Sequence, residues 1–331
     1  MELDAIDKAL LEVLQSSFPL LVRPFYELGN GIGVNENEVL LRVRRLRSQD
    51  IIRQISAIFD TRKLGYQSTL VAFHVKDEEL ESVAVQVSAH PGVSHNYARP
   101  HHYNMWFTLA VPPGKDLTAE IIHLAKKAQV SDWLNLPATR MFKLRTHFKL
   151  GNSVNPTHNA TISMDREKPK ERAIIPADIP IIQQLQQDLP LITYPFAEWA
   201  VDLNLSQEAL IKKAQELINA GIMRRFGAVL RHRKAGYKAN GMACWIVPDA
   251  HIEKAGLYAA GFPQVSHCYQ RPAYPPRWPY TLFTMVHGQT KEQVETVVAQ
   301  ISQETGLDEY EILYSTKEFK KERVRYFAER S

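Results

Sequence analysis

An internal duplication is the feature of this sequence that most constrains its fold. Residues 51–66, IIRQISAIFDTRKLGY, match residues 222–237, IMRRFGAVLRHRKAGY, at a constant offset of 171. The offset pairs Arg53 with Arg224, and both segments contain the run Arg-Lys-x-Gly-Tyr. Self-similarity of this kind marks a repeated structural unit. We therefore expect two related halves of about 150 residues each, arranged like the subunits of a fused heterodimer.

Composition narrows the class of protein without naming a function. The chain is 45% hydrophobic and 23% charged, with a formal net charge of +4, which neither requires nor excludes nucleic acid. Its two cysteines, Cys244 and Cys268, are too few for a disulfide scaffold and fit a reducing compartment. The acidic start does not match a signal peptide, and no apolar run approaches the roughly 20 residues of a membrane span. We expect a cytoplasmic protein without a membrane partner.

The beginning of each half predicts a winged helix-turn-helix. Helical spacing of apolar residues predicts a first helix, a short second helix over 24–28, a turn over 29–33, and a third helix over 36–48 capped by Asn35. The alternating segment 51–58 predicts a wing strand. The second half repeats the pattern with helices over 179–187, 195–202 and, after a Ser206 cap, up to Ala220, closed by Gly221.

The rest of each half predicts the ferredoxin-like order βαββαβ. The expected elements with clear bounds are 68–76, 78–90, 105–111, 117–128 and 139–149, and then 240–247, 250–260, 280–287, 291–304 and 309–319. The fold class is therefore α+β. The expected domains are a winged helix over 1–60, a sheet domain over 61–150, a polar linker over 151–172, a second winged helix over 173–235 and a second sheet domain over 236–331.

Two aromatic, cationic strips are the most distinctive motifs. The first is VSHNYARPHHYNMWFTLAV, residues 93–111, and the second is VSHCYQRPAYPPRWPYTLFTMV, residues 265–286. Both contain an Arg-Pro pair and then become apolar. The offset rises from 172 at the start of the strips to 176 at Phe107 and Phe283. Four extra residues therefore lie within the second strip. We expect the sheet face that carries these strips to hold the ligand.

These motifs carry a resemblance to a known family. The first 150 residues resemble the Lrp/AsnC regulators through LDAIDKALLEVLQ, ENEVLLRVRRLRSQDIIR and RKLGY. The two strips are instead similar to those of the paired subunits of sirohaem decarboxylases, and one chain with both halves resembles the fused D–L form. The resemblance implies removal of carbon dioxide from two acetate side chains of sirohaem, which leaves methyl groups (didecarboxysirohaem) in dioxo-haem biosynthesis. It implies no cofactor beyond the sirohaem substrate.

The substrate's chemistry selects candidate residues. A flat apolar ring edged with carboxylates needs an aromatic face and arginines, and the carbon that loses carbon dioxide needs a proton donor. The candidate catalytic residues are His101, His102 and Tyr97. The candidate substrate-binding residues are Arg45, Arg47, Arg53, His95, Arg99, Trp106, Arg224, Arg225, Arg231, Tyr269, Arg271, Arg277 and Trp278. Each histidine could also be an ordinary structural residue. No spacing matches a metal site made by protein alone, although His101 or His102 could ligate the substrate's iron.

The strips predict unequal halves. Ala273 and Tyr274 replace His101 and His102 in the second strip, so an equivalent proton donor is missing there. We therefore expect one main active centre, in the first half.

The third helix raises the alternative of DNA binding. Its arginines at 42, 44, 45 and 47 are of the type that contacts phosphates, but the counterpart helix has only Lys212 and Lys213. A two-fold DNA reader presents matching helices to its half-sites, so this mismatch argues against nucleic acid. The alternatives to the enzyme are an Lrp-like regulator that senses a tetrapyrrole and a non-catalytic haem carrier. A homo-oligomer, or association with related pathway enzymes, is also expected.

Overall fold

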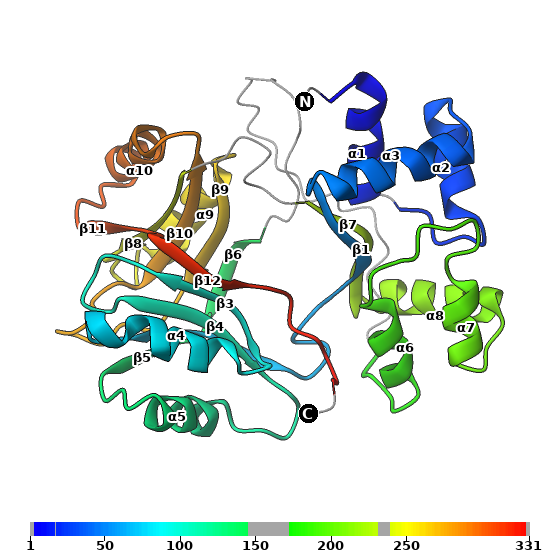
Figure 1. Ribbon diagram of the computed structural model, residues 1–331. Coiled ribbons are helices and arrows are strands. Elements are labelled where there is room, and N and C mark those ends of the chain that lie inside the picture. The colour runs from blue at the N-terminus through cyan, green and yellow to red at the C-terminus, as the bar shows by residue number, and fades with distance from the viewer. Residues whose placement is uncertain (1–2, 17, 145–171, 231–238, 329–331) are drawn as a thin grey trace.

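The first three helices of each half lie together on one side of the molecule, and the two sheets with their own helices lie on the other (Figure 1). The computed structural model describes residues 3–16, 18–144, 172–230 and 239–328. The predicted linker over 151–172 lies outside the described residues except for Arg172. None of the helices within the described ranges is long and apolar enough to cross a membrane.

The first three helices follow the sequence prediction with one correction. They are α1 (Ala5–Ser16), α2 (Pro24–Ile32) and α3 (Glu36–Ser48). The Asn35 side chain accepts a hydrogen bond from the Glu38 amide at 2.9 Å, so the predicted cap is confirmed. The turn predicted over 29–33 is wrong, because α2 continues to Ile32 and ends at Gly33 with φ 77°. Gly29 serves close packing instead, since a Cβ there would lie 2.5 Å from the Val34 carbonyl oxygen.

The second half repeats this arrangement. Its helices are α6 (Asp178–Leu185), α7 (Ala197–Asp202) and α8 (Gln207–Asn219). The predicted Ser206 cap is confirmed, because its hydroxyl accepts a hydrogen bond from the Ala209 amide at 3.1 Å.

The two wing strands pair with each other rather than forming separate hairpins. Strand β1 (Ile52–Phe59) lies antiparallel to β7 (Met223–Leu230), with Ser56 opposite Gly227. A Cβ at Gly227 would lie 2.4 Å from the Leu14 carbonyl oxygen, so the ribbon packs directly on α1. One apolar core accordingly contains residues of both winged helices. The wings join the halves.

Both sheet domains have the predicted βαββαβ order. The first contains β2 (Gln67–Phe73), the short 3₁₀ helix η1 (Asp77–Glu79), α4 (Leu80–Ser88), β3 (Val93–Ala98), β4 (Met105–Val111), α5 (Leu117–Lys127) and β5 (Trp133–Leu136). The second contains β8 (Ala239–Trp245), α9 (Ile252–Gly261), β9 (Val265–Gln270), β10 (Leu282–Gly288), α10 (Lys291–Thr305) and β11 (Tyr310–Tyr314).

Each half also contributes one strand to the sheet of the other. Strand β6 (Arg140–Leu144) pairs with β9, and β12 (Lys317–Lys321) pairs with β3, as the red strand beside β3 shows in Figure 1. The strand orders are β12-β3-β4-β2-β5 and β11-β8-β10-β9-β6. The single final strands predicted over 139–149 and 309–319 are therefore wrong. The first prediction missed β5 and assigned its place to the exchanged strand β6, and the second merged β11 with β12. The pairing partner of each exchanged strand lies far away in sequence.

The helices of each sheet domain cover one face of its sheet, and the other face packs against the other half of the chain. Separate apolar cores lie between the first sheet and α4 and α5, and between the second sheet and α9 and α10. A fourth core combines residues of both halves, including Trp106, Leu136, Trp278 and Leu313. The inner faces of the two sheets are therefore in contact, and the Arg-Pro strips lie on them.

Candidate active site

The two Arg-Pro pairs tie the halves together reciprocally. The Arg99 guanidinium donates a hydrogen bond to the Leu313 carbonyl oxygen in the second half, and Arg271 donates to that of Leu136 in the first. Burial lowers the pKa of each arginine to about 10, so both stay charged at neutral pH. Each Nε lies buried without a hydrogen-bond partner among the described residues. The expected contact of Arg99 and Arg271 with substrate stays a prediction.

The four extra residues of the second strip build a cover over the first. Tyr274 and Trp278 form an isolated β-bridge, and Trp278 is fully buried. Its ring lies 5.2 Å from that of Trp106 and 5.4 Å, edge-on, from that of His101. The Tyr274 hydroxyl donates to the Asn135 carbonyl at 2.6 Å, beside a cavity of about 430 Å³. The difference in length between the strips therefore closes the first strip rather than duplicating it.

His101 lies in the interface between the two halves, which we call the seam. Its Nδ1 accepts a hydrogen bond from the Tyr103 amide at 2.9 Å, which leaves Nε2 as the protonated nitrogen of the neutral ring. Nε2 lies 3.5 Å from Glu311 Oε2, which also accepts a hydrogen bond from the Tyr280 hydroxyl at 3.1 Å. Burial lowers the pKa of His101, although Glu311 opposes the shift. The resting ring is neutral at physiological pH.

His102 belongs to a second group of polar side chains, the Asp132 cluster, which consists of Asp132, His102, Tyr103 and Arg277. His102 Nε2 lies 2.8 Å from Asp132 Oδ2, and the Tyr103 hydroxyl donates to Asp132 Oδ1 at 3.0 Å. Arg277 reaches the same oxygen at 3.2 Å, and the His74 ring stacks on His102 at 4.0 Å. Sequence reasoning missed Asp132, Glu311 and His74, because single residues far from the strips carry no local signal.

His95 and Tyr97 occupy the inner face of β3, further along the strip. Their ring centroids are 6.2 Å apart, and the equivalent rings of His267 and Tyr269 are 6.0 Å apart. Burial, with positive charge from Lys321 and Arg53, lowers the pKa of His95 to about 4. His95 is therefore neutral at physiological pH in the absence of substrate.

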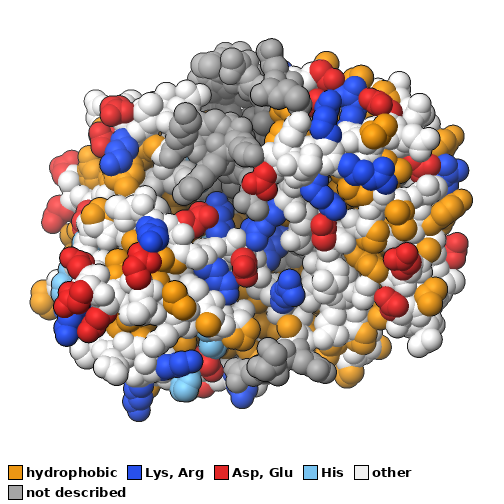
Figure 2. Space-filling view, viewed as in Figure 1, with side chains coloured by type: hydrophobic (Ala, Val, Ile, Leu, Met, Phe, Trp, Pro, Cys, Tyr) orange, Lys and Arg blue, Asp and Glu red, His pale blue; other side chains and the backbone are white. Residues whose placement is uncertain are grey.

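Arg53 of the wing strand β1 lies within range of the His95 charge, and the arginines of β7 have partners of their own. Arg225 donates hydrogen bonds to the carbonyls of Gln15 at 2.5 Å and Ala228 at 3.3 Å, and Arg224 forms an ion pair with Asp60 at 2.8 Å. Arg231 lies outside the described residues. Lys and Arg side chains gather midway between the sheets and the helices in the space-filling view (Figure 2). We call the group of side chains that comprises His95, Tyr97, Arg53 and Arg225 the central basic region, because Arg53 acts electrostatically on His95, and both arginines act on Arg323.

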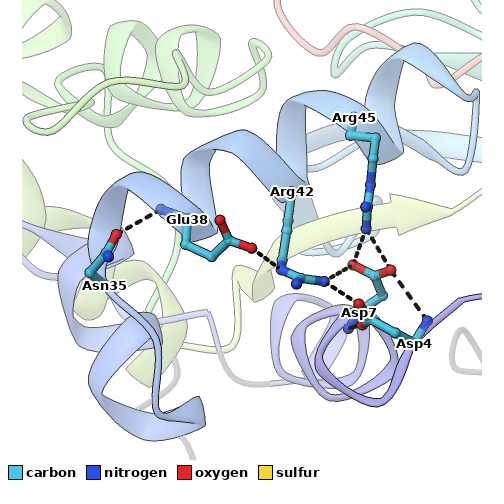
Figure 3. A network of polar contacts seen from close by, with 6 residues as sticks. All are labelled: Asp4, Asp7, Asn35, Glu38, Arg42 and Arg45. Atoms are coloured by element: carbon cyan, nitrogen blue, oxygen red, sulfur yellow. Dashed lines mark hydrogen bonds and ion pairs between the residues drawn. The ribbon is translucent and has the colours of Figure 1, made fainter.

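The arginines of α3 have other partners (Figure 3). Arg42 pairs with Asp4 at 2.7 Å and with Asp7 at 2.9 Å, and Arg45 reaches both oxygens of Asp7 at 2.5 and 2.6 Å. Arg47 pairs with Asp188 at 2.9 Å. The structure therefore brings Arg45 and Arg47 to carboxylates of the helical layer rather than to the strips. The absence of a nucleic-acid partner stays a prediction.

Comparison with known proteins agrees with this architecture. The family described as "AsnC-like ligand binding domain" matches residues 63–143 and 234–320, and "Siroheme decarboxylase NirDL-like HTH domain" matches 7–53 and 178–224. A "Siroheme decarboxylase" of Hydrogenobacter thermophilus is 39% identical over 97% of this chain and 94% of its own length. The chain belongs to the siroheme decarboxylase family. The expected kinship and the two-half α+β fold are thereby confirmed.

A solved structure from the siroheme decarboxylase family resembles this chain over its whole length, and separate subunits from the family each resemble about half of it. A crystal structure of siroheme decarboxylase NirDL superposes with a TM-score of 0.77 at 37% identity, covering 98% of this chain and 94% of that one. An alpha subunit from Desulfovibrio desulfuricans is 44% identical over 46% of this chain and 87% of its own length. A beta subunit from Methanosarcina barkeri is 43% identical over 45% of this chain and 97% of its own. Each of these subunits thus matches slightly less than half of this chain.

Proposed function

We propose that this chain removes carbon dioxide from two acetate side chains of sirohaem. In each event the bond between the methylene carbon and the carboxylate breaks, carbon dioxide leaves, and a proton adds to the carbon, which becomes a methyl group. The reaction is that of a carbon–carbon lyase. It is redox-neutral, so we propose no cofactor beyond the substrate. The names of the full-length relatives support the reaction, and a relative with a TM-score of 0.76 was solved with an iron-uroporphyrin III analogue.

The central basic region is the observation that carries the proposal. The substrate is an apolar ring with a rim of carboxylates. The region combines the rings of His95 and Tyr97 on β3 with wing arginines, of which Arg53 lies within range of the His95 charge. Guanidinium groups bind carboxylates through charge-assisted hydrogen bonds, which are strengthened where water is partly excluded. The acetate that reacts would leave this charged setting as neutral carbon dioxide. The remaining carboxylates keep the ring in place.

His95 is our proposed proton donor. Its low pKa, about 4, reflects burial and neighbouring cations. Carboxylates bound beside those cations would raise that pKa, since an opposite charge favours the protonated ring. His95 would therefore take up a proton together with the substrate and release it to the methylene carbon. Tyr97, next to it, is a second donor on the same strand face.

The residues expected from the sequence remain alternatives. The His101 side chain is only 17% exposed and packs against Trp278, so the seam would have to open before it reached a substrate. His102 is bound to Asp132 and more exposed. Either could instead ligate the substrate's iron, which would shift the main absorption band of the complex.

Anaerobic incubation with sirohaem, followed by mass spectrometry, tests the function. We expect loss of two carbon dioxide molecules. Tight binding of sirohaem with an unchanged mass would contradict the enzyme and favour a carrier. A regulator is not proposed, because carboxylates and carbonyls of the chain hold the α3 arginines. Association with further copies or with related enzymes stays a prediction.

Matched histidine variants assign the proton donor. His95→Gln should lower turnover by about 10²-fold, the usual size of a general-acid contribution, while His267→Gln at the equivalent position should lower it less. His90→Gln is the control, because that ring pairs with Glu120 at 2.9 Å on the helix-covered side. Wild-type turnover in His95→Gln would refute its role. A larger loss in His101→Ala than in His95→Gln would return the assignment to the strip histidines.

A further inference from the structure

The two exchanged strands bring different charges to the sheets they join. In the pairing of β12 with β3, Lys321 lies opposite His95. In the pairing of β6 with β9, Leu144 takes the equivalent place opposite His267. A cation thus borders one histidine, whereas an aliphatic side chain borders the other. Lys321 Nζ also lies 3.9 Å from Glu318 Oε2, a long ion pair at the edge of the sheet.

Arg323 follows two residues later and is fixed against the wing. Its Nη1 donates to Ser56 Oγ at 3.2 Å and to the Ala57 carbonyl at 3.4 Å, both on β1. The chain beyond it is anchored as well: the Tyr326 ring lies 5.0 Å from that of Tyr66, and its amide donates to Gln186 at 2.8 Å. Arg323 is therefore held in position before any ligand arrives.

Cations surround this arginine. Burial, together with repulsion from Arg225 and Arg53, lowers the pKa of Arg323 to about 10. Placing several like charges together in a partly desolvated region is unfavourable unless an anion joins them. An anionic ligand with several carboxylates would relieve the repulsion.

The two strands of the wing ribbon also differ in charge, with more positive charge on the His95 side. Arg224 is neutralised by its ion pair with Asp60. Arg53, the counterpart of Arg224 in the first half, contributes positive charge that lowers the pKa of His95. Both the exchanged strands and the wings therefore favour positive charge on the His95 side.

We infer that Lys321 and Arg323, carried into the first half by the exchanged strand β12, bind substrate carboxylates and set a preference for a highly carboxylated ring on the His95 side. This inference rests on the proposed function. It also explains how two similar sheets can treat one ligand differently, since the decisive cations belong to the opposite half of the chain.

Substitutions on β12 and just beyond it test the inference. The variants are Arg323→Gln, Arg323→Lys and Lys321→Gln, with Lys317→Gln as the control, because Lys317 pairs with Glu81 of α4 on the outer face. The measurements are KM and kcat for sirohaem, and absorbance titrations with iron-uroporphyrin III and iron-coproporphyrin III, which carry eight and four carboxylates. A melting temperature for each variant checks that the chain folds.

We expect Arg323→Gln to raise KM and the Kd of iron-uroporphyrin III about tenfold, the loss of roughly one charge-assisted contact, and to change kcat less. Lys321→Gln should act in the same direction more weakly, and Arg323→Lys should recover part of the affinity. The preference for the eight-carboxylate ring should fall in Arg323→Gln and Lys321→Gln and stay unchanged in the control Lys317→Gln.

The outcomes separate the two proposals. A wild-type chain that binds iron-uroporphyrin III but leaves sirohaem intact refutes the function, while the titrations still test the two cations. Unchanged Kd and ring preference in both Gln variants overturn the inference, even with an active wild type. If Arg323→Gln fails to fold, Lys321→Gln alone decides: a normal Kd and ring preference in that variant overturn the inference.

Discussion

The two Arg-Pro strips bind the halves in the same way and differ in the residues that follow the Arg-Pro pair. Arg99 and Arg271 each reach a carbonyl of the opposite half. Beyond them, the first strip carries His101 and His102, and the second carries a longer loop that covers the first. The repeated part of the motif therefore maintains the assembly of the halves. The residues after the Arg-Pro pairs differ between the strips and make the surroundings of His101 and His102 unlike those of the second strip.

The largest effect should come from removing the cover. Trp278→Ala should lower the free energy of unfolding by about 3–5 kcal/mol, because it empties a fully buried indole site between the halves. Trp278→Phe is the matched control, since Trp278 Nε1 has no hydrogen-bond partner among the described residues to lose. Urea unfolding measures both. Equal midpoints for the two variants would contradict the packing role of the loop.

Acid should destabilise the His95 side next. The pKa of His95 is about 4 in the folded chain and about 6.5 when unfolded, so the unfolded chain binds the extra proton as pH falls between these values. Stability should be complete above pH 6.5 and should fall by on the order of 3 kcal/mol towards pH 4. His95→Gln should lose most of this slope. Urea midpoints across the range check it, and an unchanged slope would count against the buried neutral ring.

The shared arginines should give a smaller and equal effect. Arg99→Ala and Arg271→Ala should each lower the free energy of unfolding by about 2 kcal/mol, because each removes a charged hydrogen bond and leaves a carbonyl unpaired. The result to look for is similarity of the two midpoints. A loss confined to one variant would mean that the strips do not share the tie between the halves.

The smallest effect should come from the Asp132 cluster. Burial alone would raise the pKa of Asp132, but hydrogen bonds from His102 and Tyr103 outweigh it and hold the pKa below its usual value. The resulting stability is present above about pH 4 and disappears as pH falls through the lower folded pKa. Because its partners are partly exposed, Asp132→Asn should cost less than about 1 kcal/mol at pH 7. Glu309→Gln, at the equivalent place, is the control, and an equal loss in both would deny the cluster a special role.

Local patterns predicted the elements well. Asn35 and Ser206 are helix caps as expected, and the apolar run 105–111 is a strand with the predicted bounds. Capping and periodicity depend on residues a few positions apart, so one sequence is enough to find them. The fused two-half organisation was also predictable, because the duplication is visible directly.

Long-range pairing was not predictable in the same way. No local pattern predicts that β12 pairs with β3 rather than with a strand of its own half. The alternation of apolar and polar residues shows which side chains face the core, but it does not identify the neighbouring strand. For the same reason Lys321 was not expected beside His95, nor Arg323 against the wing strand β1. Among the expected residues, Arg53 and His95 lie within range of each other's charge, whereas Arg45 and Arg47 bind carboxylates of the helical layer.

The exchange of strands also has a consequence for synthesis on the ribosome. Strand β3 ends at residue 98, and its edge partner β12 begins only at residue 317. Until the C-terminal residues emerge, the nascent first sheet presents an open strand edge, the geometry through which unfinished chains recruit one another into aggregates. We therefore expect the chain to be most prone to aggregation after β3 has been made and before β12 has emerged from the ribosome.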